Sequence, residues 1–89
     1  MLILPATLTH TQANDCLEKL TLDVQREAEQ QVVIDAAPLN NFDSSALAVL
    51  LAVRRECARA GKLFAVKGLP ARLRDLAALY GIEGLLTVA

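Results

Sequence analysis

The sequence predicts an α/β fold, with a small, mostly parallel sheet of about four strands and helices packed mainly on one face. Strand-like and helix-like segments alternate along the whole chain, which is typical of such a sheet. Residues 32–34 and 63–66 form continuous apolar runs, which indicate strands covered on both faces. A chain of 89 residues can bury only one core. We therefore expect a single domain over residues 1–89.

The chain begins with an extended pattern in residues 2–4 and 6–10, where Leu8 and His10 alternate with threonines. Pro5 interrupts it, so we predict either an edge strand or a bend between two strands. A helix over residues 13–29 follows, and Thr11 or Asn14 can cap its start. Its apolar stripe consists of Ala13, Leu17, Leu20, Val24 and Ala28.

The sequence of the middle of the chain predicts a strand, a loop and a second helix. Residues 31–36 contain the β-branched run, and residues 37–43 are rich in turn formers. The second helix spans residues 44–60 and ends before Gly61, which suits a C-terminal cap.

The last third predicts a strand, a helix and a short final strand. Residues 62–67 form the strand, and Gly68-Leu69-Pro70 opens the helix with Pro70 in its first turn. The stripe of this helix consists of Leu73, Leu76, Ala77 and Tyr80, and Gly81 caps its end. Residues 85–88 form the final strand.

Composition excludes several classes of protein. Nine basic and ten acidic residues give a net charge of −1, which argues against binding nucleic acid through phosphate neutralisation. No apolar run approaches the ~20 residues of a membrane span, and residues 1–5 lack the basic region of a signal peptide. Cys16 and Cys57 are not in a Cys-x-x-Cys pair, so we expect buried, reduced thiols in a cytoplasmic protein.

The sequence offers little for catalysis. His10 is the only histidine, and no Ser or Cys lies near it in sequence to form a base–nucleophile pair. Clustered metal ligands are lacking, and the four glycines are too dispersed for a phosphate-binding loop. We therefore expect no enzyme activity, no cofactor and no metal.

The most concentrated polar feature is Asn40-Asn41-Phe42-Asp43-Ser44-Ser45, between a buried strand and an apolar helix. Ligands and partners usually bind at such a carboxyl end of a strand. Asp43 or Ser44 can cap the helix, and capping alone is one explanation of this segment. Capping does not explain why two consecutive serines follow an adequate cap. Hydroxyl groups at a helix N-terminus are favourable sites for phosphate.

A helical wheel divides the helix over residues 44–60 into two arcs. The arc predicted to face the sheet holds Ala46, Leu47, Leu50, Val53 and Cys57. The opposite arc holds Ala48, Ala52, Arg55, Glu56 and Arg59, while Val49, Leu51 and Arg54 lie at the margins. A partner helix could approach closely over Ala48 and Ala52, with Arg55 and Arg59 as rim charges. Alternatively, the alanines reflect helix propensity alone.

The apolar content of 54% also favours a surface that binds a protein partner. A chain this short buries only about 60% of the surface that it exposes when unfolded, so some apolar residues lie at the surface. A protein partner would explain that surplus. Scattered surface Ala and Leu residues are the alternative.

The segment Asp43-Ser44-Ser45-Ala46-Leu47, after a buried strand and a short loop, resembles the Asp-Ser-Ser-Gly-Leu signature of STAS domains. Lys67-Gly68-Leu69-Pro70 and the stretch over residues 76–81 are similar to the small stand-alone, MlaB-like STAS subunits of Mla-type phospholipid ABC transporters. The resemblance covers nearly the whole chain, although Ala46 stands where the signature has Gly.

The resemblance implies a non-enzymatic regulatory and assembly subunit, cytoplasmic or peripheral at the inner membrane, that binds the ATPase subunit of the transporter. Together with the helical wheel, this reading gives the expected partner-binding residues as Asn41, Phe42, Asp43, Ser44, Ser45, Ala48, Leu51, Ala52, Arg55 and Arg59. The alternative is an anti-sigma factor antagonist whose partner is a kinase-like anti-sigma factor. In that branch of the family, Ser44 matches the phosphoacceptor.

Overall fold

The computed structural model describes residues 1–89 and contains five strands, three α-helices and one short 3-10 helix. The strands are β1 (Leu2–Ile3), β2 (Thr7–Leu8), β3 (Gln31–Asp35), β4 (Asn41–Phe42) and β5 (Leu63–Lys67). The helices are α1 (His10–Arg26), α2 (Ser45–Arg59) and α3 (Ala71–Leu79), followed by the 3-10 helix η1 (Glu83–Leu85). The alternation of strands and helices predicted from the sequence is confirmed as far as α3.

The main sheet has the strand order β1-β3-β5, and both pairs of neighbours are parallel. A second, two-stranded parallel sheet pairs β2 with β4, beyond the carboxyl ends of β1 and β3. The predicted final strand is reduced to one parallel bridge between Val66 and Val88. Residues 83–85 form η1 instead, so the strand predicted over residues 85–88 is largely wrong.

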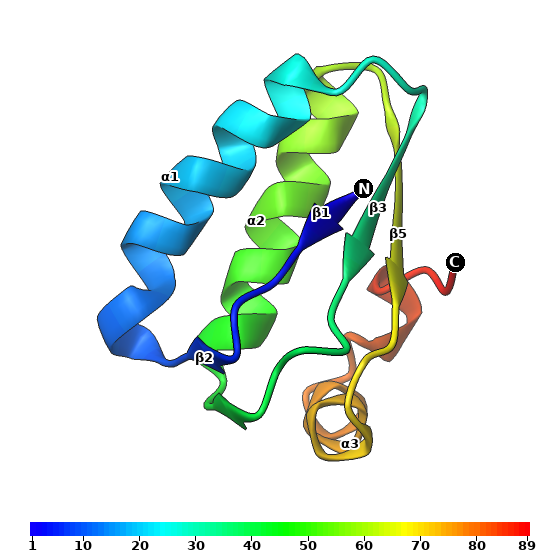
Figure 1. The fold of residues 1–89 in the computed structure, drawn as a ribbon. Coiled ribbons are helices and arrows are strands. Elements are labelled where there is room, and N and C mark those ends of the chain that lie inside the picture. The colour runs from blue at the N-terminus through cyan, green and yellow to red at the C-terminus, as the bar shows by residue number, and fades with distance from the viewer.

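The helices α1 and α2 lie side by side on one face of the main sheet, and both begin at the end where the strands finish (Figure 1). The α3 helix lies beside that same end, directly after β5. Strands added in one direction through right-handed crossovers place successive helices on one face. The turns that precede α1, α2 and α3 are thereby gathered at one end of the molecule.

The core lies between the main sheet and this helical layer. Its fully buried side chains include Leu8, Leu20, Ile34, Leu50 and Val53, and no polar residue is buried with them. Each completely buried aliphatic side chain of this kind contributes about 1.5–3 kcal/mol to folding. The apolar surface removed from water between the sheet and the helices therefore stabilises the fold.

The outer face of the sheet is mostly open, so the prediction that both faces are covered holds only around Ala65, which is completely buried between its neighbours on β5. In β3, Val32 and Ile34 are completely buried, whereas Val33 between them is only partly buried. Ile3 and Leu63, on the flanking strands, are 56% and 61% exposed. A continuous β-branched run indicates a strand but not which faces are covered, because coverage depends on where the crossover helices pack.

The first helix begins earlier than predicted. Thr9 caps α1 in a capping box with Gln12, whose side-chain oxygen accepts the Thr9 backbone N–H at 2.9 Å. His10 is therefore the first residue of a helix and not part of a strand, and neither Thr11 nor Asn14 is the cap. Because α1 ends at Arg26, Ala28 is exposed outside its predicted stripe.

The third helix also differs in detail from its prediction. Pro70 occupies the position before the first helical residue, and Leu73 and Ala77 are buried as predicted. Tyr80 is 55% exposed, so its place in the buried stripe is wrong. It follows the last turn of a nine-residue helix, where the chain already turns at Gly81.

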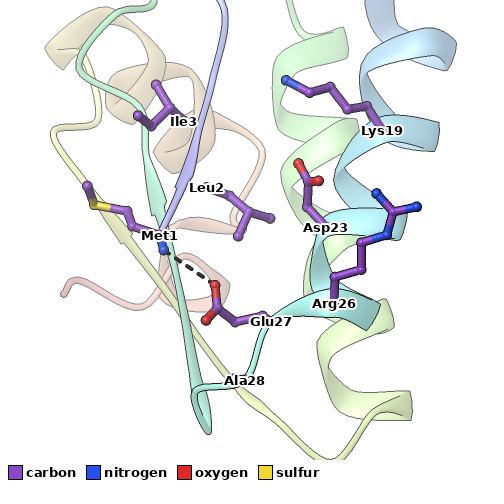
Figure 2. Close-up of a pocket in the computed structure, with 8 residues that line it drawn as sticks. All are labelled: Met1, Leu2, Ile3, Lys19, Asp23, Arg26, Glu27 and Ala28. Carbon is purple, nitrogen blue, oxygen red and sulfur yellow. Dashed lines mark hydrogen bonds and ion pairs between the residues drawn. The ribbon is translucent and has the colours of Figure 1, made fainter.

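The segment directly after α1 is held by polar contacts with Lys62 and with the N-terminus. The Lys62 ammonium group donates to the backbone carbonyls of Glu27 at 2.6 Å and Glu29 at 2.8 Å. The N-terminal ammonium group of Met1 lies 3.4 Å from the Glu27 carboxylate, beside a hollow of about 580 Å³ lined by charged α1 side chains (Figure 2). The pKa of Glu27 is lowered, mainly by the backbone N–H of Glu29 and also by this ammonium group.

Candidate functional site

The candidate site lies where α1 and α2 both begin, and Asp43 joins the two helices there. One carboxylate oxygen of Asp43 accepts the backbone N–H of Ser45, the first residue of α2, at 2.8 Å. The other accepts the backbone N–H of His10, the first residue of α1, at 3.1 Å. One side chain therefore satisfies an unpaired donor at the start of each helix.

These hydrogen bonds act on the charge state of Asp43. Its pKa lies below the ordinary value of 3.8, mainly because the Ser45 N–H stabilises the carboxylate, with a further contribution from the His10 N–H. Two helix N-termini that meet at one carboxylate also favour its negative charge. Asp43 is therefore an ionised structural cap at neutral pH.

His10 comes from the other side of this junction and was not predicted to be there. Its ring Nδ1 lies 3.5 Å from the carboxylate oxygen of Asp43 that accepts the His10 N–H, and its side chain is 82% exposed. The sequence signal that could have placed His10 at a helix start is the capping-box spacing of Thr9 and Gln12. Its proximity to Asp43 depends on how the two helices pack.

Ser44 and Ser45 have different environments. Ser44 is exposed, has a helical backbone conformation, and makes no capping hydrogen bond through its hydroxyl. Ser45 is partly buried at the first position of α2. Of the two caps allowed by the sequence, Asp43 is the one used, and the Ser44 hydroxyl remains free at the surface.

The segment before Asp43 is held in place by backbone pairing that the sequence analysis missed. Asn40 and Asn41 both donate their backbone N–H groups to the Ala6 carbonyl, at 2.8 and 3.0 Å, and β4 then pairs with β2. Their side chains are exposed, whereas Phe42 is partly buried against the core. Within the segment predicted as a loop, Asn41–Phe42 thus form a short strand held in a defined position.

Phe42 also contacts α3. The guanidinium carbon of Arg72 lies 5.0 Å from the centre of the Phe42 ring, in a cation–π arrangement. Beside this pair is a hollow of about 300 Å³, lined by Leu39, Asn40, Phe42, Pro70, Ala71 and Arg72. Arg72 was not among the candidate site residues, because no local pattern connects it to Phe42.

The burial of the α2 residues agrees with the two arcs of the helical wheel except at Ala52. The five residues assigned to the sheet-facing arc are all buried, and Ala48, Arg55 and Arg59 are exposed. Ala52, assigned to the exposed arc, is only 9% exposed, so that assignment is wrong. Arg54 and Ala58 line the side of α2 nearest β5, and the helical period places Ala52 on the opposite side of the helix.

The remaining residues on α2 form the rim of its exposed face. Leu51 is partly buried and packs against the core, and Arg59 forms an ion pair with Glu56 at 3.0 Å. The exposed strip of α2 is thus apolar at Ala48 and basic toward Arg59. It begins directly beside Ser44.

The match to a family covers this whole arrangement: residues 2–87 match the family described as "Mlab, STAS domain". The chain belongs to this MlaB-type STAS family. No individually curated protein matches the sequence. The α/β fold of this STAS domain, with three helices and small parallel sheets, agrees with the family assignment. MlaB-type STAS domains are generally binding subunits without catalytic activity.

Three further features of the chain concern metal ligands, cysteines and membrane spans. No group of three or more His, Cys, Asp or Glu side chains could hold a metal ion. Both cysteines of this STAS domain are free: Cys57 is completely buried, whereas Cys16 is only partly buried on α1, contrary to the prediction that both are buried. Burial raises the pKa of each thiol.

No helix is both long and apolar enough to cross a bilayer.

Proposed function

We propose that this STAS domain, taken as one domain over residues 1–89, is a non-enzymatic regulatory and assembly subunit of an Mla-type phospholipid ABC transporter. Its partner in this proposal is the ATPase subunit on the cytoplasmic side of the membrane. The family assignment supports the transporter class. The observation that carries the binding site is the free, exposed hydroxyl of Ser44, beside a carboxylate that already caps the helix.

The docking surface extends from the segment Asn41–Ser45 onto α2. Capping by Asp43 fixes the position of Ser44, and pairing of β4 with β2 fixes the position of Asn41 and Phe42. Ala48, Leu51, Arg55 and Arg59 continue the surface along the helix, with the arginines at its rim. Where backbone and short side chains such as Ser44, Ser45 and Ala48 are already fixed in position, little conformational entropy is lost when a partner binds.

Charge at Ser44 provides the sharpest test of this surface. Ser44→Ala removes a hydroxyl that makes no capping hydrogen bond, so folding should change by less than about 0.5 kcal/mol. Ser44→Asp adds a negative charge beside Asp43, which water screens in the free domain. An interface removes that water, and an unpaired buried charge there costs several kcal/mol.

The experiment is a binding titration of wild type, Ser44→Ala and Ser44→Asp against the purified ATPase subunit, with melting curves of each variant as the folding control. We expect Ser44→Asp to weaken binding at least tenfold, about 1.4 kcal/mol, and far more than Ser44→Ala does. Equal affinities for wild type and Ser44→Asp would place Ser44 outside the interface. Purification of the chain from its native cell, with identification of the co-purified protein, tests the partner itself.

The second candidate function is an anti-sigma factor antagonist controlled by phosphorylation of Ser44. The exposure of Ser44 at the start of a 15-residue helix favours it, because a kinase can reach the hydroxyl and the helix N-terminus favours the phosphate. Mass spectrometry of the native chain distinguishes the two candidates. A phosphorylated Ser44 together with a co-purified kinase-like protein would support the antagonist and count against the transporter subunit.

A further inference from the structure

The hollow between β4 and α3 joins an apolar wall to a free cation. Leu39, Phe42, Pro70 and Ala71 supply carbon surface, while Asn40 and Arg72 supply the polar groups at its rim. It adjoins the proposed docking surface, because Phe42 immediately precedes Asp43. Two elements about 30 residues apart in the chain thus form one recess.

Arg72 is exposed but held in position. The three ion pairs of the molecule do not include it, and its guanidinium group makes no hydrogen bond within the chain. The Phe42 ring lies against the guanidinium group at 5.0 Å, which restricts the side chain without using its N–H groups. Arg72 is therefore an exposed, pre-positioned donor that lacks an acceptor within the chain.

Arg72 occupies a position in α3 where a positive charge does not stabilise the helix. It is the second residue of α3, where the helix macrodipole disfavours a positive charge. The first turn of α3 contains no acidic residue to offset it. The charge of Arg72 therefore gains nothing from the dipole of its own helix.

We propose that Arg72, stacked on Phe42, binds a carboxylate side chain of the protein partner and extends the docking surface from β4 onto α3. This proposal rests on the function proposed above and adds the chemistry that the partner presents. The planar guanidinium group can donate two parallel hydrogen bonds to one carboxylate, which an ammonium group cannot do. The apolar wall of the hollow accommodates the methylene groups of a glutamate.

Such a pair has the features of an interface hot spot. Arg and aromatic residues dominate binding energy where they are packed and shielded from water. Docking would cover the guanidinium edge and strengthen its hydrogen bonds to the carboxylate by excluding competing water. Arg74, two residues along α3, lines a different hollow and does not stack on a ring, so it provides a matched control of equal charge.

The experiment measures the affinity of the ATPase subunit for wild type, Arg72→Gln, Arg72→Lys and Arg74→Gln. We expect Arg72→Gln to weaken binding about tenfold or more, Arg72→Lys to restore part of the loss, and Arg74→Gln to stay within about twofold of wild type. Phe42→Leu keeps the apolar wall but removes the ring, so alone it should weaken binding. In the double variant with Arg72→Gln it should cause little further loss of affinity. Added salt should weaken binding of wild type more than binding of Arg72→Gln.

The outcomes separate this proposal from the proposed function. If Ser44→Asp abolishes binding while Arg72→Gln binds like wild type, the docking surface stands and the carboxylate anchor is wrong. Equal losses for Arg72→Gln and Arg74→Gln would indicate general charge attraction and would also overturn the anchor. A melting curve of each variant excludes loss of folding as the cause.

A second measurement does not depend on the ATPase. N-acetylglutamate methylamide, which presents one side-chain carboxylate, is titrated into the isotope-labelled domain, with the corresponding glutamine compound as the uncharged control. We expect saturable NMR shifts at the Arg72 Nε–H and the Asn40 side-chain amide with the glutamate compound only. Absence of these shifts, or equal shifts at Arg74, would overturn the proposal even if the ATPase is not the partner.

Discussion

Asp43 and His10 lie 33 residues apart in the chain, yet the Asp43 carboxylate accepts the His10 backbone N–H at 3.1 Å. The same carboxylate accepts the Ser45 N–H at 2.8 Å, so one side chain holds the starts of α1 and α2 together. The position of Ser44 at the candidate docking surface depends on this junction, because Ser44 lies between the residue that caps and the residue that is capped.

Removing the carboxylate of Asp43 should destabilise the domain and change its response to acid. The folded-state pKa is below 3.8, so this group contributes stability that is fully present above its unfolded pKa and is lost as pH falls through the lower folded value. Thermal melting between neutral pH and about pH 2.5 measures this effect. We expect Asp43→Asn to have a lower melting temperature at neutral pH and a smaller further loss below about pH 4 than wild type.

Asp43→Ala provides the comparison, because alanine accepts no hydrogen bond whereas the asparagine oxygen can still accept one. The alanine variant should therefore melt below the asparagine variant. If Asp43→Asn and wild type lose stability in parallel below pH 4, Asp43 does not supply the pH-dependent contribution.

The glycine at the turn before α3 should be the least replaceable of the four. Gly68 has φ +69°, and a Cβ atom there would lie 2.9 Å from the Cβ of Ala37. Gly61 has the same φ but nothing within 4 Å of such an atom. We expect Gly61→Ala to cost about 1–2 kcal/mol from backbone strain, and Gly68→Ala to cost a further 1–3 kcal/mol or so from the steric clash.

Urea unfolding of the two variants gives both free energies on one scale. Equal losses for Gly61→Ala and Gly68→Ala would mean that the chain near Ala37 can move away. The contact between the loop after β3 and the turn before α3 would then not fix the position of α3 beside Phe42.

Cys57 should tolerate polar replacement poorly. Its side chain is completely buried on the sheet-facing side of α2, where a serine hydroxyl would lack a good partner. Cys57→Ser should therefore lower the free energy of unfolding by roughly 1–3 kcal/mol. Cys16→Ser is the control, because Cys16 is only partly buried and its replacement should cost less. The same urea experiment measures both variants, and an unchanged stability for Cys57→Ser would contradict the packing of α2.

The partner should stabilise the domain. Ile3, Leu63, Leu79 and Tyr80 are among the large apolar side chains left exposed in this short chain, so its own core accounts for only part of its apolar surface. A partner that binds only the folded form adds about 2.7 kcal/mol when its concentration is 100 times the dissociation constant. The melting temperature should rise as the ATPase subunit is added, whereas no rise in the presence of demonstrated binding would count against this coupling.

The sequence by itself determined the order of the elements and most of the core. The periods of apolar residues act within one strand or one helical turn, so Val32, Leu50 and Leu73 could be assigned to the interior without knowledge of their neighbours. The positive φ at Gly61 and Gly81 likewise follows from a local requirement, the turn that ends a helix. The segment around Ser44 was also recognisable, because its signature residues are consecutive.

Only the tertiary structure decided which distant groups meet. The shared cap of Asp43 with His10, the contact of Arg72 with Phe42, the pairing of β2 with β4 and the burial of Ala52 all join separate elements. The mostly open outer face of the sheet is a result of the same kind, since it depends on where α1 and α2 pack. Local patterns specify which side of an element is apolar, but only the packing of the elements determines what covers that side, because contacts far apart in the chain form together when the core closes.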